Sequence, residues 1–236
     1  MNNTRFTSLA SQGIVVDPRY WATNAGYEFQ CNFGNVDLVT VLSATNDGLS
    51  GYGWVTTSLL AVDGTAGDLL DAADVTPTHI LTDASADALS SPRIFGSYSH
   101  ALQASRFLGY MPTKLVMECY AAFTVNSAFE NATFFGLAGP TVTAANAAGS
   151  CASIYANNGG GNFRLDSQSG GDNGATSDTA WHKWKIVVDA TNTEWFIDDV
   201  SQGTITTEAD DWPCSFRLIA STTNRIALSW VRIYYE

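Results

Sequence analysis

The sequence predicts an all-β sandwich of two antiparallel sheets with little helix, and three observations support this prediction. Apolar and polar residues alternate over many short segments, which is the pattern of strands that bury one face. Clusters of Gly, Asn, Asp and Ser separate these segments, as expected of turns. Aromatic residues make up 12% of the chain and charged residues only 14%, a composition that suits a broad β-sheet core. A chain of 236 residues is long enough for one such domain.

The clearest segment is 181–205, WHKWKIVVDATNTEWFIDDVSQGTI, which predicts a β-hairpin. Trp184, Ile186 and Val188 alternate with polar residues until 190–193 break the pattern. The alternation then resumes in phase, so we expect one buried patch formed by Trp184, Ile186, Val188, Trp195 and Ile197.

The rest of the chain predicts further strands and few other elements. We expect strands at 26–33, 36–42, 51–62, 114–125, 132–139, 151–156, 163–165, 216–221 and 226–235, the last buried on both faces. A short helix is expected at 66–74 and a surface loop at 83–91, and 157–179 is expected to be loops around the strand at 163–165. We expect residues 22–236 to form a single sandwich and residues 1–21 to form an arm outside it.

The segment 181–205 resembles the signature of concanavalin A-like (laminin G-like) jelly rolls. The resemblance rests on the opening Trp181-His182, a strand ending in Asp, a polar turn, and a strand with an aromatic-Ile-Asp end. In that superfamily the second strand ends in an Asp-Gly turn, whereas here we expect the turn at 199–203, DVSQG, with a late Gly. The resemblance covers 114–236 best and implies a jelly-roll sandwich, a fold that hosts several functions.

Many members of that superfamily are glycoside hydrolases or polysaccharide lyases, so carboxylate pairs are of interest. A retaining glycosidase needs two carboxyl groups about 5–5.5 Å apart, which on one strand usually means a Glu-x-Asp-x-Glu run. The sequence has no such run. Glu194 and Asp198 share a face but lie roughly 13 Å apart along an extended strand. Acids from neighbouring strands could still converge, but we expect no catalytic residue, and for Glu118 a solvated position or a pairing with Lys114 or Arg232.

We also expect no metal and no cofactor. The acids Asp63, Asp68, Asp71 and Asp74 lack the spacing of an EF-hand loop, although Asp198, Asp199, Asp210 and Asp211 could approach one another. No phosphate-binding or dinucleotide motif is present, and His79, His100 and His182 form no catalytic set, so a structural role is expected for His182.

Four cysteines, Cys31, Cys119, Cys151 and Cys214, are far apart with no CxxC pair. They do not predict a zinc site, and we expect free thiols, with two disulfides as the alternative.

Charge excludes two classes of partner. The net charge is −12, the pI is near 4.4 and only eleven Lys and Arg are scattered along the chain, which argues against nucleic acid and against an anionic membrane surface. No run of about 18 apolar residues predicts a membrane span, and the N-terminus lacks the apolar core of a secretory signal.

By resemblance and elimination, the chain is similar to the laminin G-like proteins of tailed-phage virions. The segments that suggest this are 118–124, 134–137 and 181–205. The resemblance implies a non-enzymatic capsid decoration (cement) protein, made in the host cytoplasm, that binds the major capsid protein or tail subunits and forms a homo-oligomer such as a trimer. Phe6, Leu9 and Val15 would anchor the arm on a neighbouring subunit.

Two other functions stay open. A secreted or cell-surface carbohydrate-binding lectin or adhesin would need exposed aromatic residues, for which Trp21, Trp54 and Trp212 are the candidates, whereas Trp184, Trp195 and Trp230 are expected in the core. A glycoside hydrolase or polysaccharide lyase would need two carboxylates within about 10 Å on a concave sheet face.

Overall fold

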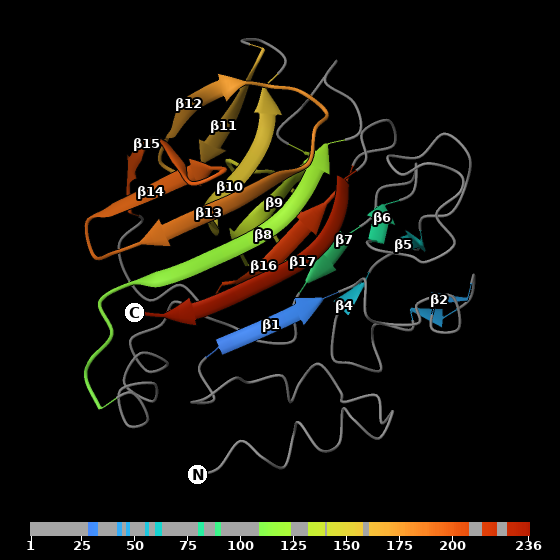
Figure 1. The fold of residues 1–236 in the computed structure, drawn as a ribbon, viewed down its shortest axis with the longest axis horizontal. Helices are drawn as coiled ribbons and strands as arrows, with labels where there is room; N and C mark the ends of the chain where they lie inside the picture. The colour runs from blue at the N-terminus through green and yellow to red at the C-terminus, as the bar shows by residue number, and fades with distance from the viewer. Residues whose placement is uncertain are drawn as a thin grey trace.

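The computed structural model describes residues 109–123, 132–139, 141–157, 161–207, 214–220 and 226–236, together with seven short strands in the first 108 residues. These residues form two antiparallel sheets that pack face to face (Figure 1). The predicted all-β sandwich is therefore confirmed.

The first sheet, here called sheet I, has the strand order β15-β14-β13-β8-β17-β6-β5, and β1 also pairs with β17. Its strands are β1 (Glu28–Asn32), β5 (Leu60–Val62), β6 (Ile80–Thr82), β8 (Leu115–Phe123), β13 (His182–Val188), β14 (Asn192–Ile197), β15 (Val200–Thr206) and β17 (Ile226–Tyr235).

The second sheet, here called sheet II, has the order β12-β11-β10-β9-β16-β7-β4. Its strands are β4 (Val55–Thr56), β7 (Ala88–Ser90), β9 (Phe134–Ala138), β10 (Ser150–Asn157), β11 (Asn162–Asp166), β12 (Gly171–Thr176) and β16 (Ser215–Ile219). A separate hairpin joins β2 (Leu42–Ser43) to β3 (Asn46–Asp47).

The core lies between the sheets and contains the predicted patch. Trp184, Ile186, Trp195 and Ile197 are buried, and Val188 is partly buried against them. The indole Nε1 of Trp184 donates a hydrogen bond of 2.9 Å to the carbonyl of Ala121, so this polar atom is satisfied inside the core. The rings of Phe123, Phe135 and Phe163 contact Trp184 edge-on, with centroids 4.8–6.1 Å away.

Two strands lie where loops were expected. β12 has the sequence GDNGAT, which carries no apolar alternation, and it lies at the edge of sheet II. β7 lies inside the predicted surface loop 83–91, and its Ser90 is buried. The edge position of β12 explains the first error, because such a strand needs no buried apolar face, and the length of β7, three residues, is too short to show a period of two.

The turn of the second hairpin also differs from the expectation. Asp198 and Asp199 form a two-residue turn between Ile197 and Val200, with φ of 51° and 65°. Positive φ at both positions is the geometry of a type I′ turn, which Asp tolerates. Gly203 lies instead inside β15, at a bulge opposite Trp195, so the expected 199–203 turn was wrong.

β17 is buried on both faces only at its beginning. Ile226, Ala227 and Leu228 are buried, and the pairing with β8 then shifts register between Leu228 and Trp230. After this bulge the burial alternates, and Trp230 is only half-buried. The expectations of a fully buried strand and of Trp230 in the core were therefore wrong.

Several expectations concern residues that lie outside the described ranges. They include the arm at 1–21, the helix at 66–74 and most of the strand at 36–42, and the extent of the single domain stays a prediction. Cys119, Cys151 and Cys214 are buried thiols and not half-cystines, in agreement with the expectation of thiols, whereas the side chain of Cys31 lies outside the described residues. Burial, assisted by Glu118, raises the pKa of the Cys119 thiol. In the described part of the chain, no helix is long and apolar enough to cross a membrane.

Candidate functional site

The outer face of sheet I carries a transverse row of side chains from β14, β13, β8 and β17. Strand pairing aligns Phe196 with Lys185, Lys185 with Glu118, Glu118 with Arg232, and Arg232 with Gln30. Their sequence neighbours in β8, β13, β14 and β17 point into the core, so alternation directs the members of the row in these strands to the outside.

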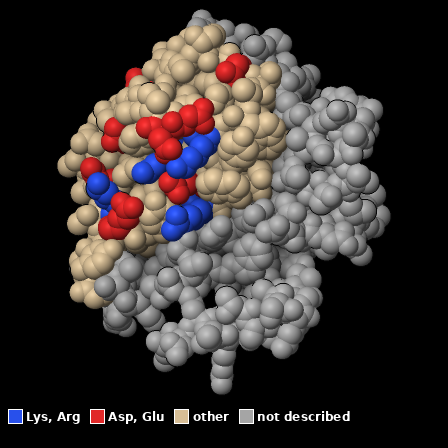
Figure 2. Space-filling view, viewed as in Figure 1, with Lys and Arg blue, Asp and Glu red and all other residues tan. Residues whose placement is uncertain are grey.

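Charges on this face are balanced around Glu118. One carboxylate oxygen of Glu118 lies 3.8 Å from Nζ of Lys183 and the other lies 3.8 Å from Nη1 of Arg232. Lys183 also bonds Asp199 at 2.8 Å, and this hydrogen bond is the main reason that its pKa is raised. Nζ of Lys185 lies over the Phe196 ring, 5.4 Å from its centroid. Figure 2 shows these mixed charges gathered on the face that β8, β13 and β17 present in Figure 1.

Aromatic rings adjoin the charged row. Tyr120 and Trp181 are stacked, with centroids 5.2 Å apart and an interplanar angle of 21°. Tyr120 is 37% exposed and Trp181 is half-buried. Arg232 covers the Tyr234 ring at 4.3 Å from its centroid. The face therefore offers ring surface beside hydrogen-bonding groups of both signs.

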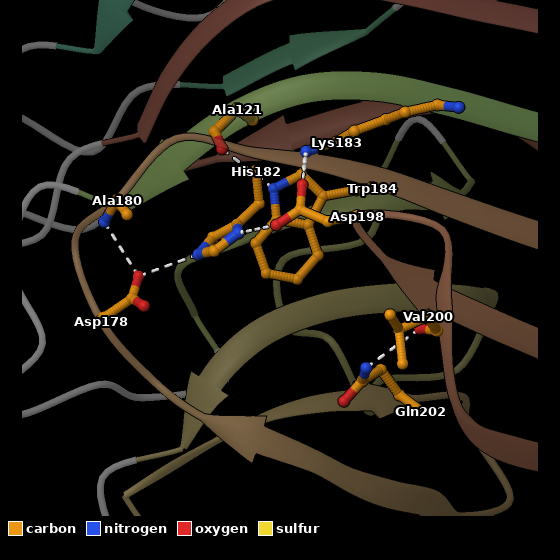
Figure 3. A network of polar contacts seen from close by, with 9 residues as sticks. All are labelled: Ala121, Asp178, Ala180, His182, Lys183, Trp184, Asp198, Val200 and Gln202. Atoms are coloured by element: carbon orange, nitrogen blue, oxygen red, sulfur yellow. Dashed lines mark hydrogen bonds and ion pairs between the residues drawn. The ribbon is translucent and has the colours of Figure 1, made fainter.

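A histidine network fixes the edge of this face (Figure 3). His182 Nδ1 lies 2.6 Å from Oδ2 of Asp198, and Nε2 lies 3.0 Å from Oδ1 of Asp178. The other oxygen of Asp198 accepts the backbone N–H of Lys183 at 2.9 Å. Both ring nitrogens are thus engaged, and the network ties the 198–199 turn to the start of β13. The expected structural role of His182 agrees with this arrangement.

These contacts set the charges of the network. Burial lowers the pKa of His182, but the hydrogen bonds to Asp198 and Asp178 outweigh burial and raise the pKa above its ordinary value. Burial raises the pKa of Asp198, but its bonds to His182 and to the Lys183 backbone outweigh this and lower the pKa.

The outer face of sheet II differs, because a loop covers it. The segment 141–149 places Val142 and Ala145 in a small apolar cluster with Phe134, Tyr155 and Ile219. Beneath it, the Tyr155 hydroxyl donates to Asp166 at 2.8 Å, and Arg164 Nε donates to the other oxygen of Asp166 at 2.6 Å. Burial and the bond to Asp166 raise the pKa of Tyr155, so this phenol is a poor general base at neutral pH.

The structure brings together few of the residues that the sequence singled out. Trp21, Trp54 and Trp212, as well as Phe6, Leu9 and Val15, lie outside the described residues, as do Asp210 and Asp211. The pairing of Glu118 with Arg232 is confirmed, and Lys183 is a second partner. Glu194 accepts a hydrogen bond from Ser201, separately from the Asp198 network. No three His, Cys, Asp or Glu side chains in the described ranges are arranged to hold a metal ion.

Sequence reasoning named Glu118 and Arg232 as a pair but missed the other residues that make up this face: Tyr120, Trp181, Lys183 and Lys185. Their signal was present in the outward phases of β8, β13 and β17. Only the pairing register shows that these outward positions lie side by side.

No family model and no curated protein matches this sequence. Solved structures are nevertheless similar in shape. Crh5 transglycosylase without ligand matches with a TM-score of 0.50 and 12% identity over 89% of this chain and 85% of that chain. Its complex with NAG matches with a TM-score of 0.50 and 12% identity over 93% and 90%. The Emp47p carbohydrate recognition domain matches with a TM-score of 0.49 and 9% identity over 91% and 96%.

The fold is a jelly-roll sandwich of two antiparallel sheets, similar in shape to Crh5 transglycosylase. The resemblance seen in 181–205 is thereby confirmed for the fold, and at these identities the likeness extends to the fold alone. A sialidase also matches, with a TM-score of 0.49 and 11% identity over 89% of this chain, but this chain spans only 18% of its length. The neighbours named here are thus a transglycosylase, a carbohydrate recognition domain and a sialidase.

Proposed function

We propose that this protein is a non-catalytic carbohydrate-binding module and that the outer face of sheet I binds the glycan. The observation that carries the proposal is the stacked pair of Tyr120 and Trp181 beside the Lys183–Glu118–Arg232 charges. The apolar face of a sugar ring packs against an aromatic ring, and its hydroxyl edge needs donors and acceptors close by.

The balance of charges favours sugar hydroxyls over a strongly charged ligand. Lys183 and Arg232 are donors, and Glu118 between them is an acceptor. Charge-assisted hydrogen bonds from such groups are stronger than neutral ones, while the paired charges leave little net field. A neutral or weakly charged oligosaccharide fits this face best.

Catalysis is not part of the proposal, because Glu118 and Asp166, the acids at the centres of the two polar clusters described above, are engaged by cations. Glu118 lies between Lys183 and Arg232, and Asp166 is paired with Arg164. A glycosidase needs two carboxyl groups that are available to the scissile bond, whereas these two are held in ion pairs. We expect the parent protein to release no reducing sugar from glucan and to leave alginate intact. Turnover that Glu118→Gln abolishes, while Glu194→Gln retains it, would show an enzyme instead.

The virion role expected from the sequence has no support in the comparisons. The capsid or tail partners, the oligomeric state and the location of the protein stay predictions.

A binding experiment tests the proposal. The parent protein is screened on a glycan array, and the best oligosaccharide is then titrated into the parent, Tyr120→Ala and Lys183→Ala by calorimetry. Each variant should lose about tenfold in affinity, or about 1.4 kcal/mol. Tyr110→Ala is the matched control, because Tyr110 is also exposed, at 54%, but precedes β8. A parent that binds no glycan, or a Tyr120→Ala protein that binds as well as Tyr110→Ala, would refute the proposal.

A further inference from the structure

Arg217 is a buried arginine in the middle of the outer face of sheet II. It lies in β16, where it pairs with Ser90 of β7 on one side and with Gly136 of β9 on the other. The same transverse row continues through Ser153 to Asp166. Arg217 is only 5% exposed, although arginine is rarely buried without a charged partner.

Among the described residues, only neutral groups accept hydrogen bonds from Arg217. Its Nη1 donates to the Ser90 hydroxyl at 2.6 Å, and its Nε donates to the carbonyl of Val142 at 3.2 Å. Within the described residues, no carboxylate lies within ion-pair distance of this guanidinium. The contrast is Arg164, at the far end of the same face, which has Asp166 at 2.6 Å.

A buried charge without a counter-charge costs free energy, so an anion bound beside Arg217 would stabilise the protein. Burial is the cause that lowers the pKa of Arg217, as expected where no negative group offsets desolvation. The guanidinium has five N–H donors in a planar fork, of which the bonds to Ser90 and Val142 use two. The remaining donors include both on Nη2.

The geometry of the fork selects the ligand. Two parallel N–H donors match the two oxygens of a planar carboxylate. Asp166, the acid in this row, is already neutralised by Arg164 and bonded by Tyr155, so it adds little repulsion. The Val142 bond occupies Nε beneath the 141–149 loop, and no described residue accepts a hydrogen bond from Nη2.

We propose that Arg217 binds the carboxylate group of a small organic acid or of an acidic sugar. The site lies on sheet II, opposite to the face proposed to bind neutral glycan. The two proposals are therefore independent, and either can fail alone.

The Arg Nε–Hε resonances of the ¹⁵N-labelled full chain provide the test. The protein is titrated separately with sodium acetate, sodium glucuronate, sodium chloride and glucose at constant ionic strength. We expect the Arg217 signal to shift saturably with a carboxylate and to stay in place with chloride and glucose. The Arg164 signal is an internal control that should stay in place throughout, because Asp166 already occupies that guanidinium.

Arg217→Lys keeps the charge and loses the planar fork, so it should bind the same carboxylate at least tenfold more weakly, measured by its thermal stabilisation. Lys114→Met, an exposed position that precedes β8 and lies outside the proposed glycan-binding face, should bind it as the parent does. A shift with both acids indicates a general carboxylate site, and a shift with glucuronate alone indicates an acidic sugar; both support the proposal. No saturable shift, an equal shift with chloride, or unchanged binding by Arg217→Lys would overturn it.

Discussion

Trp195 shows how a single side chain closes one edge of the sandwich. It is fully buried, and its ring lies so close to β12 that a Cβ on Gly174 would approach it to 2.6 Å. Its neighbour Phe196 points to the other side of the sheet and is partly exposed. Adjacent aromatic residues therefore have different tasks, one in the core and one on the candidate site.

This difference predicts the effect of truncating each ring. Trp195→Ala should lower the free energy of unfolding by about 3–5 kcal/mol, as truncation of large core side chains does. Phe196→Ala should cost clearly less, because its ring keeps contact with water. Urea denaturation measures both. A cost under about 1 kcal/mol for Trp195→Ala would contradict its place in the core.

The His182 network predicts a pH dependence of stability. Because the folded pKa of His182 is raised, its contribution is complete below the unfolded pKa of about 6.5 and is lost as the pH rises through the folded pKa. Because the folded pKa of Asp198 is lowered, its contribution is present above the unfolded value and is lost as the pH falls through the folded pKa. The network should stabilise the protein between these two pKa values.

Unfolding free energies of the parent and of His182→Gln, measured from about pH 5 to pH 9, check this window. The difference between the two proteins removes the contributions of His79 and His100. It should shrink as the pH rises through the raised pKa of His182. A constant difference across this range would contradict the assigned charges.

At the scale of elements, the pairing register between strands determines the bulges and the surface positions, and composition does not reveal it. The alternation in 181–197 was sufficient to predict β13, β14 and their buried patch, because long strands with one dry face show a period of two. β12 was missed because its sequence, GDNGAT, has no apolar alternation. β7 was missed because three residues are too few to show a period of two. The bulges before Trp230 and at Gly203 also left no signal, since they depend on the partner strand.

A substitution at Gly136 of β9 tests the close approach of β9 to β10. The φ of this glycine is 154°, and a Cβ there would overlap the backbone carbonyl of Ala152 in β10. Gly136→Ala should therefore lower the free energy of unfolding by about 2 kcal/mol or more. Gly170→Ala is the matched control, because a Cβ there meets no atom within 4 Å. Equal stabilities of the two variants in urea denaturation would contradict the strand register at Gly136.

At the scale of the whole molecule, the sequence was sufficient for the fold class and for the core, but not for the surfaces. Tyr120, Lys183 and Arg232 come from three different strands. Arg217 differs from Arg164 because no described carboxylate lies within ion-pair distance of it. Such relations depend on pairing between distant segments, which one sequence does not reveal. The tryptophans chosen from the sequence as glycan contacts lie outside the described residues.

The N-terminal arm remains a prediction at this scale. Residues 1–21 have few apolar side chains, so ordering them alone would cost roughly 1–2 kcal/mol per residue without enough burial in return. If Phe6 and Leu9 anchor the arm on a partner, deleting residues 1–12 should leave the circular dichroism spectrum of a folded sandwich and weaken self-association or partner binding. Unchanged association, measured by analytical ultracentrifugation, would contradict the predicted role of the arm in binding a neighbouring subunit.

The most direct test of glycan binding on sheet I is the response of the indole N–H signals in ¹H–¹⁵N NMR. The oligosaccharide selected on the array is titrated into ¹⁵N-tryptophan-labelled protein. We predict a saturable shift of the Trp181 signal, which Tyr120→Ala weakens, and little change at the buried Trp184 and Trp195. A titration that shifts other signals and leaves Trp181 in place would contradict the account.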